Sequence, residues 1–170
     1  LVASHNPDDT LPVGITTVTY TATDAAGNST TESFNITVKD TEAPTLICKM
    51  SSTLPGATIT IADVYAGSSD NCGVDLSTLS LTVSGPITCS NLGQVSYTLS
   101  VEDIHGNIGT CSGTIDVIDN VPPTAICQDI NLYLDANGTA TLTPSMVDNG
   151  STDNCGIASM TVNKTLFNCS

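Results

Sequence analysis

Residues 13–28 read VGITTVTYTATDAAGN, and residues 92–107 read LGQVSYTLSVEDIHGN, 79 positions further along the chain. In both stretches apolar side chains alternate with polar ones and then give way to an Asp-x-x-Gly-Asn segment. Alternation with a period of two predicts a half-buried β-strand, and Asp, Gly and Asn favour tight turns. The stretch therefore predicts a strand that leads into a hairpin, and its recurrence predicts a repeated domain.

The repetition extends beyond this stretch. The offset of 79 also carries Asp40 to Asp119 and Cys48 to Cys127. Residues 67–73, which end in Asp-Asn-Cys-Gly, return 83 positions later as residues 150–156. We expect the four extra residues in a turn around 134–138. These offsets predict the C-terminal part of one repeat (1–40), a complete repeat (41–120) and the N-terminal part of a third (121–170).

Composition agrees with a folded β protein. Apolar residues make up 39% of the chain and charged residues only 12%, and Thr and Val are abundant. Thr58–Ile61 and Leu79–Val83 are predicted as further strands, and we expect most aromatic side chains on the core faces of strands. About seven short strands per repeat predict an all-β chain of tandem immunoglobulin-like antiparallel β-sandwich repeats, each of about 80 residues.

The charge is strongly acidic. Seventeen Asp and Glu face three Lys and no Arg, for a net charge of -14. Binding to nucleic acid or to anionic membranes depends on basic residues, so we expect neither nucleic-acid binding nor direct membrane insertion. No catalytic motif is present, and His105, at a predicted hairpin tip, is expected to be solvated, so we expect no enzyme activity.

Seven cysteines without a C-x-x-C pair predict disulfides and therefore an extracellular location. The complete repeat contains Cys48, Cys72, Cys89 and Cys111, which permit three pairings. The residues alone do not choose among these pairings.

Acidic and amide side chains mark the predicted junctions between repeats. In an immunoglobulin-like sandwich, the loops that carry Asp70 and Asp103 lie at the end where the preceding linker arrives. Carboxylate and amide oxygens are the ligands that Ca²⁺ takes, six to eight at a time, so the sequence predicts calcium at these junctions. The alternative is that the same residues serve only as turns and caps. The predicted ligands are Asp40, Glu42, Asp70, Asn71, Asp103 and Asn107 at the first junction, and Asp119, Asn120, Asp148, Asp153 and Asn154 at the second.

Residues 11–28 resemble the HYR (hyalin repeat) module, an immunoglobulin-like extracellular adhesion domain. The Asp-Asn-Cys-Gly segments and the Thr-rich, Arg-free background resemble the tandem repeats of giant Bacteroidetes surface adhesins, including the SprB-type adhesins of gliding motility. The first copy departs from the pattern, because Glu32 stands where the next copy has Cys111.

The resemblance favours one disulfide scheme. It implies a local Cys72–Cys89 bond and a Cys48–Cys111 bond that ties the first strand to the last. By repetition, Cys155 would pair with Cys169, and the partner of Cys127 would lie beyond Ser170.

The leading functional hypothesis is therefore a structural and adhesive stalk at the cell surface, whose repeats are spacers and contact their neighbours in the chain. Its target, a surface polysaccharide or protein, is not identified by the sequence, and Thr-rich edge strands make lateral self-association of chains feasible. Two alternatives stay open: a carbohydrate- or protein-binding module, and an accessory region of a secreted hydrolase.

Overall fold

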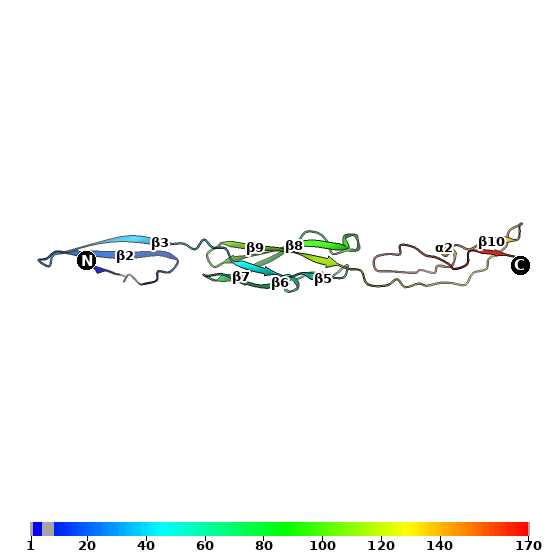
Figure 1. The fold of residues 1–170 in the computed structure, drawn as a ribbon, viewed down its shortest axis with the longest axis horizontal. Coiled ribbons are helices and arrows are strands. Elements are labelled where there is room, and N and C mark those ends of the chain that lie inside the picture. Colours follow the sequence, from blue (N-terminus) through cyan, green and yellow to red (C-terminus); the bar gives the residue numbers. More distant parts are fainter. Residues whose placement is uncertain (1, 5–8, 170) are drawn as a thin grey trace. The chain divides into compact units, whose positions relative to one another are not determined.

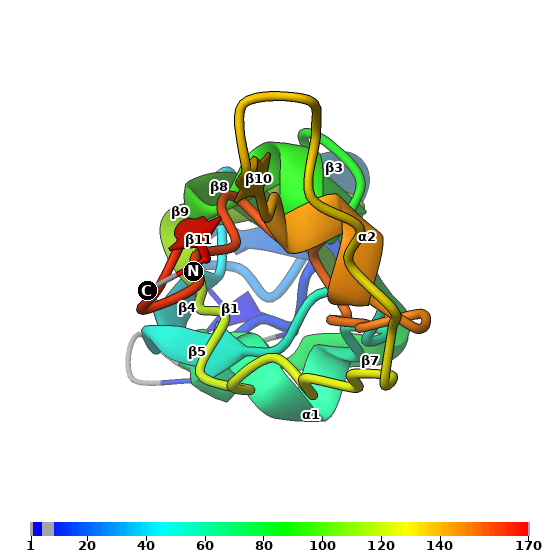
Figure 2. The same ribbon diagram turned by 90° about the vertical axis from the view of Figure 1, so that its right-hand side faces the viewer.

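The computed structural model describes residues 2–4 and 9–169, and almost all of its regular structure is β-strand (Figure 1). The two α-helices, α1 (Ile61–Val64) and α2 (Pro144–Val147), are single turns (Figure 2). No helix in the described residues is long and apolar enough to cross a membrane. The predicted all-β class is therefore confirmed.

The N-terminal segment forms a single antiparallel sheet. β2 (Gly14–Thr23) pairs with β3 (Ser29–Val38) along its whole length, and β1 (Val2–Ala3) pairs with β2. The strand and hairpin predicted for this stretch are thus present. Tyr20 and Phe34, however, are 41% and 52% exposed rather than buried, since no second sheet covers them in the part of the segment that the structure describes.

Residues 45–117 form two sheets. One pairs β4 (Thr45–Cys48) with β6 (Tyr65–Ser69), and the other has the strand order β5-β9-β8-β7. A 3-10 turn at Cys89–Asn91 precedes β8. The strands of the larger sheet are β5 (Ser51–Thr53), β7 (Val74–Val83), β8 (Gly93–Asp103) and β9 (Ile108–Val117).

One pairing in the larger sheet is parallel, contrary to the predicted antiparallel arrangement. β5 runs parallel to β9, with Ser51 opposite Ile115 and Thr53 opposite Val117. Only Lys49 and Met50 separate β4 from β5. Because two residues are too few for a reversal that also changes sheets, the chain keeps its direction as it passes from β4 to β5.

The core of this segment follows the predicted alternation. On β8, Tyr97, Leu99 and Val101 are at most 1% exposed, and Ile115 and Val117 on β9 are at most 2% exposed. The alternation ends at Asp103, the one buried polar residue among the described residues. A carboxylate thus occupies the position at which another apolar side chain would continue the core.

The predicted strand at Thr58–Ile61 is absent. The carboxylate of Asp63 accepts hydrogen bonds from the N–H and the hydroxyl of Thr60, at 2.8 and 2.7 Å, and this local cap starts α1 instead of a strand. In the C-terminal segment, β10 (Thr139–Thr141) pairs with β11 (Leu166–Asn168), and the turn predicted around 134–138 precedes β10.

Contacts between residues group the chain into two compact units. The first unit comprises residues 1–48, 65–80 and 99–111, and the second comprises residues 49–64, 81–98 and 112–170. The division into three repeats at residues 40 and 120 remains a prediction, and each of the four sheets lies inside one of the predicted ranges.

Candidate functional site

Three of the predicted ligands meet within the first unit. Asp40 follows β3, Asp70 follows β6 and Asp103 ends β8, and each offers a carboxylate oxygen within 4.8 Å of the other two. The side chain of Asp40 and the residue Asp103 are each only 3% exposed. Three carboxylates are therefore held together in a largely buried position, which is costly for like charges unless cations or hydrogen bonds offset them.

Hydrogen bonds within the hairpin between β8 and β9 satisfy both carboxylate oxygens of Asp103. Its Oδ1 accepts the N–H groups of His105 and Asn107 at 2.8 and 2.9 Å, and its Oδ2 accepts the side-chain amide of Asn107 at 2.7 Å. Burial acts to raise the pKa of Asp103, but these hydrogen bonds outweigh burial and hold the pKa below its usual value. Gly106 completes the turn with a φ of 89° that favours glycine.

The first copy of this hairpin is built in the same way. Asp24 accepts the N–H groups of Ala26 and Asn28 and the side-chain amide of Asn28. Turn chemistry therefore accounts for the Asp-x-x-Gly-Asn pattern in both copies, and any cation at Asp103 would be additional to it.

Asp70 is not satisfied in this way. Its Oδ1 accepts the N–H groups of Cys72 and Gly73 at 2.8 and 3.0 Å, but its Oδ2 is buried and has no hydrogen-bond partner. The one other such atom among the described residues is Oδ1 of Asp153, the counterpart of Asp70 in the next copy. A buried carboxylate oxygen without a partner is costly, and this arrangement occurs at the same position in two copies of the repeat.

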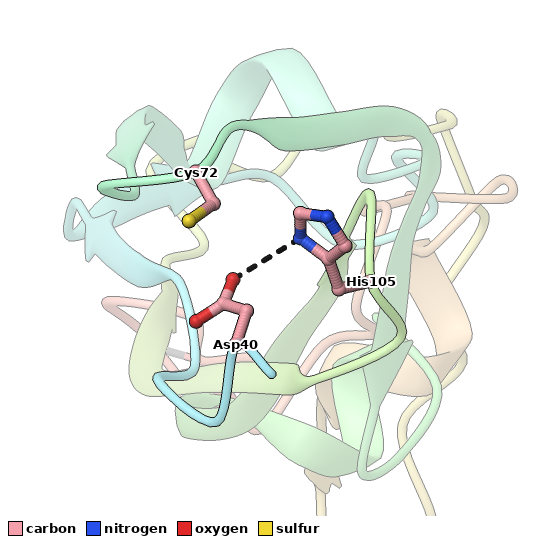
Figure 3. A group of neighbouring side chains, drawn as sticks. All are labelled: Asp40, Cys72 and His105. Atoms are coloured by element: carbon pink, nitrogen blue, oxygen red, sulfur yellow. Dashed lines mark hydrogen bonds and ion pairs between the residues drawn. The ribbon is translucent and has the colours of Figure 1, made fainter. Parts of the chain in front are cut away.

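Figure 3 shows a second group of donors, Asp40, Cys72 and His105, which partly overlaps the first. Nδ1 of His105 lies 3.2 Å from Oδ2 of Asp40, and the His105 side chain is 25% exposed. His105 is exposed, as expected of a hairpin tip, and the linker after β3 in addition brings Asp40 against it, a contact that the sequence did not predict.

The thiol of Cys72 is a poor metal ligand in this setting. Burial raises its pKa, and a hydrogen bond to Asp40 and the charges of Asp40, Asp70 and Asp103 raise it further. A metal binds the thiolate rather than the thiol. The donor set thus favours a hard cation on the carboxylate oxygens over a thiolate-bound metal.

The remaining first-junction residues, Glu42, Asn71 and Asn107, each take part in a hydrogen bond. Glu42 and Asn71 pair with each other, with 2.7 Å between the amide nitrogen of Asn71 and Oε2 of Glu42. The amide nitrogen of Asn107 is engaged by Asp103. Both hydrogen bonds use the amide nitrogen of the asparagine, whereas a cation would bind the amide oxygen.

The second-junction residues are only partly assembled. The side-chain amide of Asn154 donates to Asp119 at 3.1 Å, and Asp153 accepts the N–H of Cys155 at 2.8 Å. Asp148 instead accepts the N–H of Ser151 at 3.0 Å. Asn120 is exposed, and the described residues hold no group of three carboxylates here.

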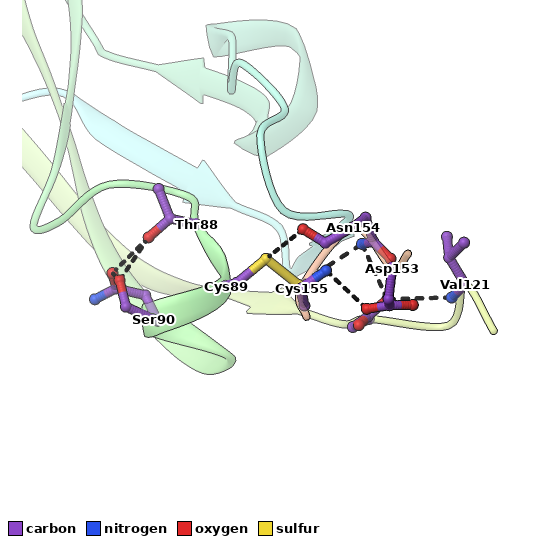
Figure 4. Close-up of a disulfide and its surroundings, with 9 residues drawn as sticks. Thr88, Cys89, Ser90, Val121, Asp153, Asn154 and Cys155 are labelled. Atoms are coloured by element: carbon purple, nitrogen blue, oxygen red, sulfur yellow. Dashed lines mark hydrogen bonds between the residues drawn. A yellow bond between two sulfur atoms is a disulfide. The ribbon is translucent and has the colours of Figure 1, made fainter. Parts of the chain in front are cut away.

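Two disulfides are present. Cys48 on β4 bonds to Cys111 on β9, as the favoured scheme expected, with 6.0 Å between the Cα atoms. The second bond joins Cys89 to Cys155, with 5.2 Å between the Cα atoms (Figure 4). The expected Cys72–Cys89 and Cys155–Cys169 bonds are therefore wrong, and Cys72, Cys127 and Cys169 are free thiols.

Strand geometry explains the first error, and the bond of Cys155 to Cys89 rules out the second predicted pair. Cys72 precedes β7 and Cys89 follows it, and a ten-residue strand separates its ends by about 30 Å, whereas a disulfide needs Cα atoms within about 7 Å. Cys169 follows β11 and places its sulfur 3.7 Å from the carbonyl oxygen of Gly138, away from Cys155. The favoured scheme closed a local loop between Cys72 and Cys89 although Leu79–Val83, between them, is itself predicted as a strand.

Comparison with known proteins gives a consistent family relationship. The HYR domain model matches residues 1–38. Hyalin of Strongylocentrotus purpuratus is 32% identical over 179 residues, covering 92% of this chain and 14% of that protein. Hyalin of Lytechinus variegatus is 31% identical over 147 residues, covering 76% of this chain and 27% of that protein. The chain therefore spans less than a third of either relative, and its sequence is that of an HYR-like repeat protein similar to hyalin.

Proposed function

We propose that this chain is a stalk segment of an extracellular adhesive protein, built from tandem immunoglobulin-like repeats that disulfides and Ca²⁺ stiffen. The acidic, Arg-free composition, the two disulfides and the similarity to hyalin support an extracellular repeat protein. The Cys48–Cys111 bond supports the sandwich, because it joins a strand of the β4-β6 sheet to a strand of the larger sheet.

One observation carries the calcium proposal: the buried Oδ2 of Asp70 has no hydrogen-bond partner and belongs to a carboxylate that converges with Asp40 and Asp103. Ca²⁺ binds carboxylate oxygens and would neutralise their mutual repulsion. Asp40 comes from the linker, whereas Asp70 and Asp103 come from the loops that follow β6 and β8. An ion held by all three would fix the linker against the next repeat.

Thermal unfolding with and without Ca²⁺ tests the proposal. Addition of Ca²⁺ to the EGTA-treated protein should raise the melting temperature, and Asp70→Asn should abolish the rise. Asp129→Asn makes the same charge change at an exposed position and should keep the rise. Equal melting temperatures of the unmodified protein in EGTA and in Ca²⁺ would contradict calcium binding.

The finer assignment, a Bacteroidetes gliding-motility adhesin of the SprB type, rests on resemblance to that group's repeats. If it is right, deletion of the full-length gene from a gliding bacterium should abolish gliding, and reintroduction should restore it. Deletion mutants that glide normally would leave a general adhesive stalk as the function.

A second candidate is a carbohydrate-binding module, and exposed aromatic side chains favour it. Tyr20 and Phe34 are diagonal neighbours on one face of the β2–β3 hairpin and are substantially exposed, and sugars stack on such rings. Glycan-array binding that Tyr20→Ala weakens would support this function, and an array without binding would remove it.

A further inference from the structure

The Cys89–Cys155 bond joins two different predicted repeats. Cys89 lies in the 3-10 turn just before β8, and Cys155 lies in the Asp-Asn-Cys-Gly segment of the following repeat. The Cys89 sulfur lies 3.3 Å from the carbonyl oxygen of Asn154, beside the disulfide (Figure 4). The side-chain amide of Asn154 donates a hydrogen bond to Asp119 in the linker. The linker, the Asp-Asn-Cys-Gly segment and the preceding repeat therefore meet at this bond.

The internal repetition identifies the same positions at the other junction. Cys72 is the counterpart of Cys155, 83 positions earlier, and Thr10 is the counterpart of Cys89, 79 positions earlier. Asn71 also contacts the linker there, through Glu42, much as Asn154 contacts Asp119. At both junctions the asparagine before the cysteine therefore contacts an acidic residue of the linker, at different linker positions. The junctions differ in that one has a cysteine pair and the other has threonine and cysteine.

We infer that the Asp-Asn-Cys-Gly cysteine is the acceptor of a disulfide from the preceding repeat, and that Thr10 and Cys72 form the same junction without its covalent bond. Cys72 is then free because its partner position holds threonine. The inference thus explains why Cys72 has no disulfide, whereas the predicted Cys72–Cys89 bond does not form. The inference rests on the repeat arrangement of the proposed function but not on calcium.

A substitution that restores the cysteine pair tests this inference. In Thr10→Cys, oxidised glutathione should take two electrons and two protons from the thiols of residues 10 and 72, which form a disulfide while the glutathione becomes two thiols. Oxidation should lower the number of free thiols in this variant from four to two, and peptide mapping should find residue 10 joined to Cys72. Thr30→Cys, at an exposed position on β3, should instead give four free thiols.

The reciprocal change tests the other junction. Cys89→Thr copies the first junction and should release Cys155, so that free thiols rise from three to four. Four free thiols in oxidised Thr10→Cys, or a bond from residue 10 to Cys127 or Cys169, would overturn the inference. Calcium-dependent melting is measured separately. If Ca²⁺ still raises the melting temperature but residue 10 does not cross-link to Cys72, only the inferred disulfide pairing between repeats is refuted.

Discussion

The hydroxyl of Tyr97 donates a hydrogen bond to the backbone carbonyl oxygen of Lys49, with 2.6 Å between the two oxygens. Tyr97 is 1% exposed, and burial raises the pKa of its phenol. The hydroxyl therefore stays protonated at neutral pH and remains a donor. This bond ties the middle of β8 to the short connection between β4 and β5, where the chain changes sheets.

Tyr97→Phe should lower the free energy of unfolding by about 1–2 kcal/mol, because it removes the hydroxyl that donates to the carbonyl oxygen of Lys49. Urea unfolding measures the change. Tyr133→Phe, at an 84% exposed position, is the matched control and should leave stability unchanged. An equal effect of both substitutions would mean that the Tyr97 hydrogen bond makes no net contribution.

Gly109 and Gly113 on β9 are positions at which the fold has no room for a side chain. A Cβ at Gly109 would overlap the carbonyl oxygen of Pro44, and a Cβ at Gly113 would lie 2.5 Å from the Tyr97 hydroxyl oxygen. Gly109→Ala should cost about 3 kcal/mol because backbone must move, and Gly113→Ala about 1–3 kcal/mol. Gly85→Ala, which meets no atom closer than 3.7 Å, should be near neutral in the same unfolding assay.

The Cys48–Cys111 bond should contribute most of the stabilisation that disulfides give residues 45–117. It closes a loop with a sequence separation of 63, for which loss of chain entropy predicts about 4 kcal/mol. The Cys48→Ala, Cys111→Ala double variant should lose about this amount in guanidinium unfolding. If the double variant and the unmodified protein unfold at the same denaturant concentration, the bond has no stabilising role.

Local pattern predicted the strands and hairpins well and predicted long-range partners poorly. The alternation at Tyr97, Leu99 and Val101 indicated their common face, because the period of a strand is a property of consecutive residues. The partner of Cys89 lies 66 residues away and depends on where β7 ends, which no local pattern contains. The same limit applies to Tyr20, since its burial depends on whether another sheet covers β2.

The sequence predicted that the three carboxylates of the candidate cation site converge, but it did not predict which of their oxygens have hydrogen-bond partners. Convergence of Asp40, Asp70 and Asp103 followed from placing two loops and a linker at one end of the predicted sandwich. Hydrogen bonds satisfy Asp103, whereas one oxygen of Asp70 has no partner. This difference depends on side-chain positions, which the sequence pattern does not contain. The contact of His105 with Asp40 was not predicted because it joins residues 65 positions apart.

Acid should destabilise the fold through its hydrogen-bonded turn carboxylates. Hydrogen bonds hold the pKa values of Asp24, Asp103 and Asp135 below their usual value, with burial opposing them. Since an unfolded aspartate titrates near about 3.9, the unfolded chain binds more protons than the folded one just below that pH, and stability falls as the pH decreases through the folded pKa values. Urea unfolding in EGTA at several pH values between about 5 and 2 should show this fall.

Asp103→Asn should make the fall shallower, whereas Asp129→Asn, which changes the same charge at an exposed position, should not. An unchanged pH dependence in Asp103→Asn would mean that its hairpin hydrogen bonds do not favour the charged carboxylate over the neutral one.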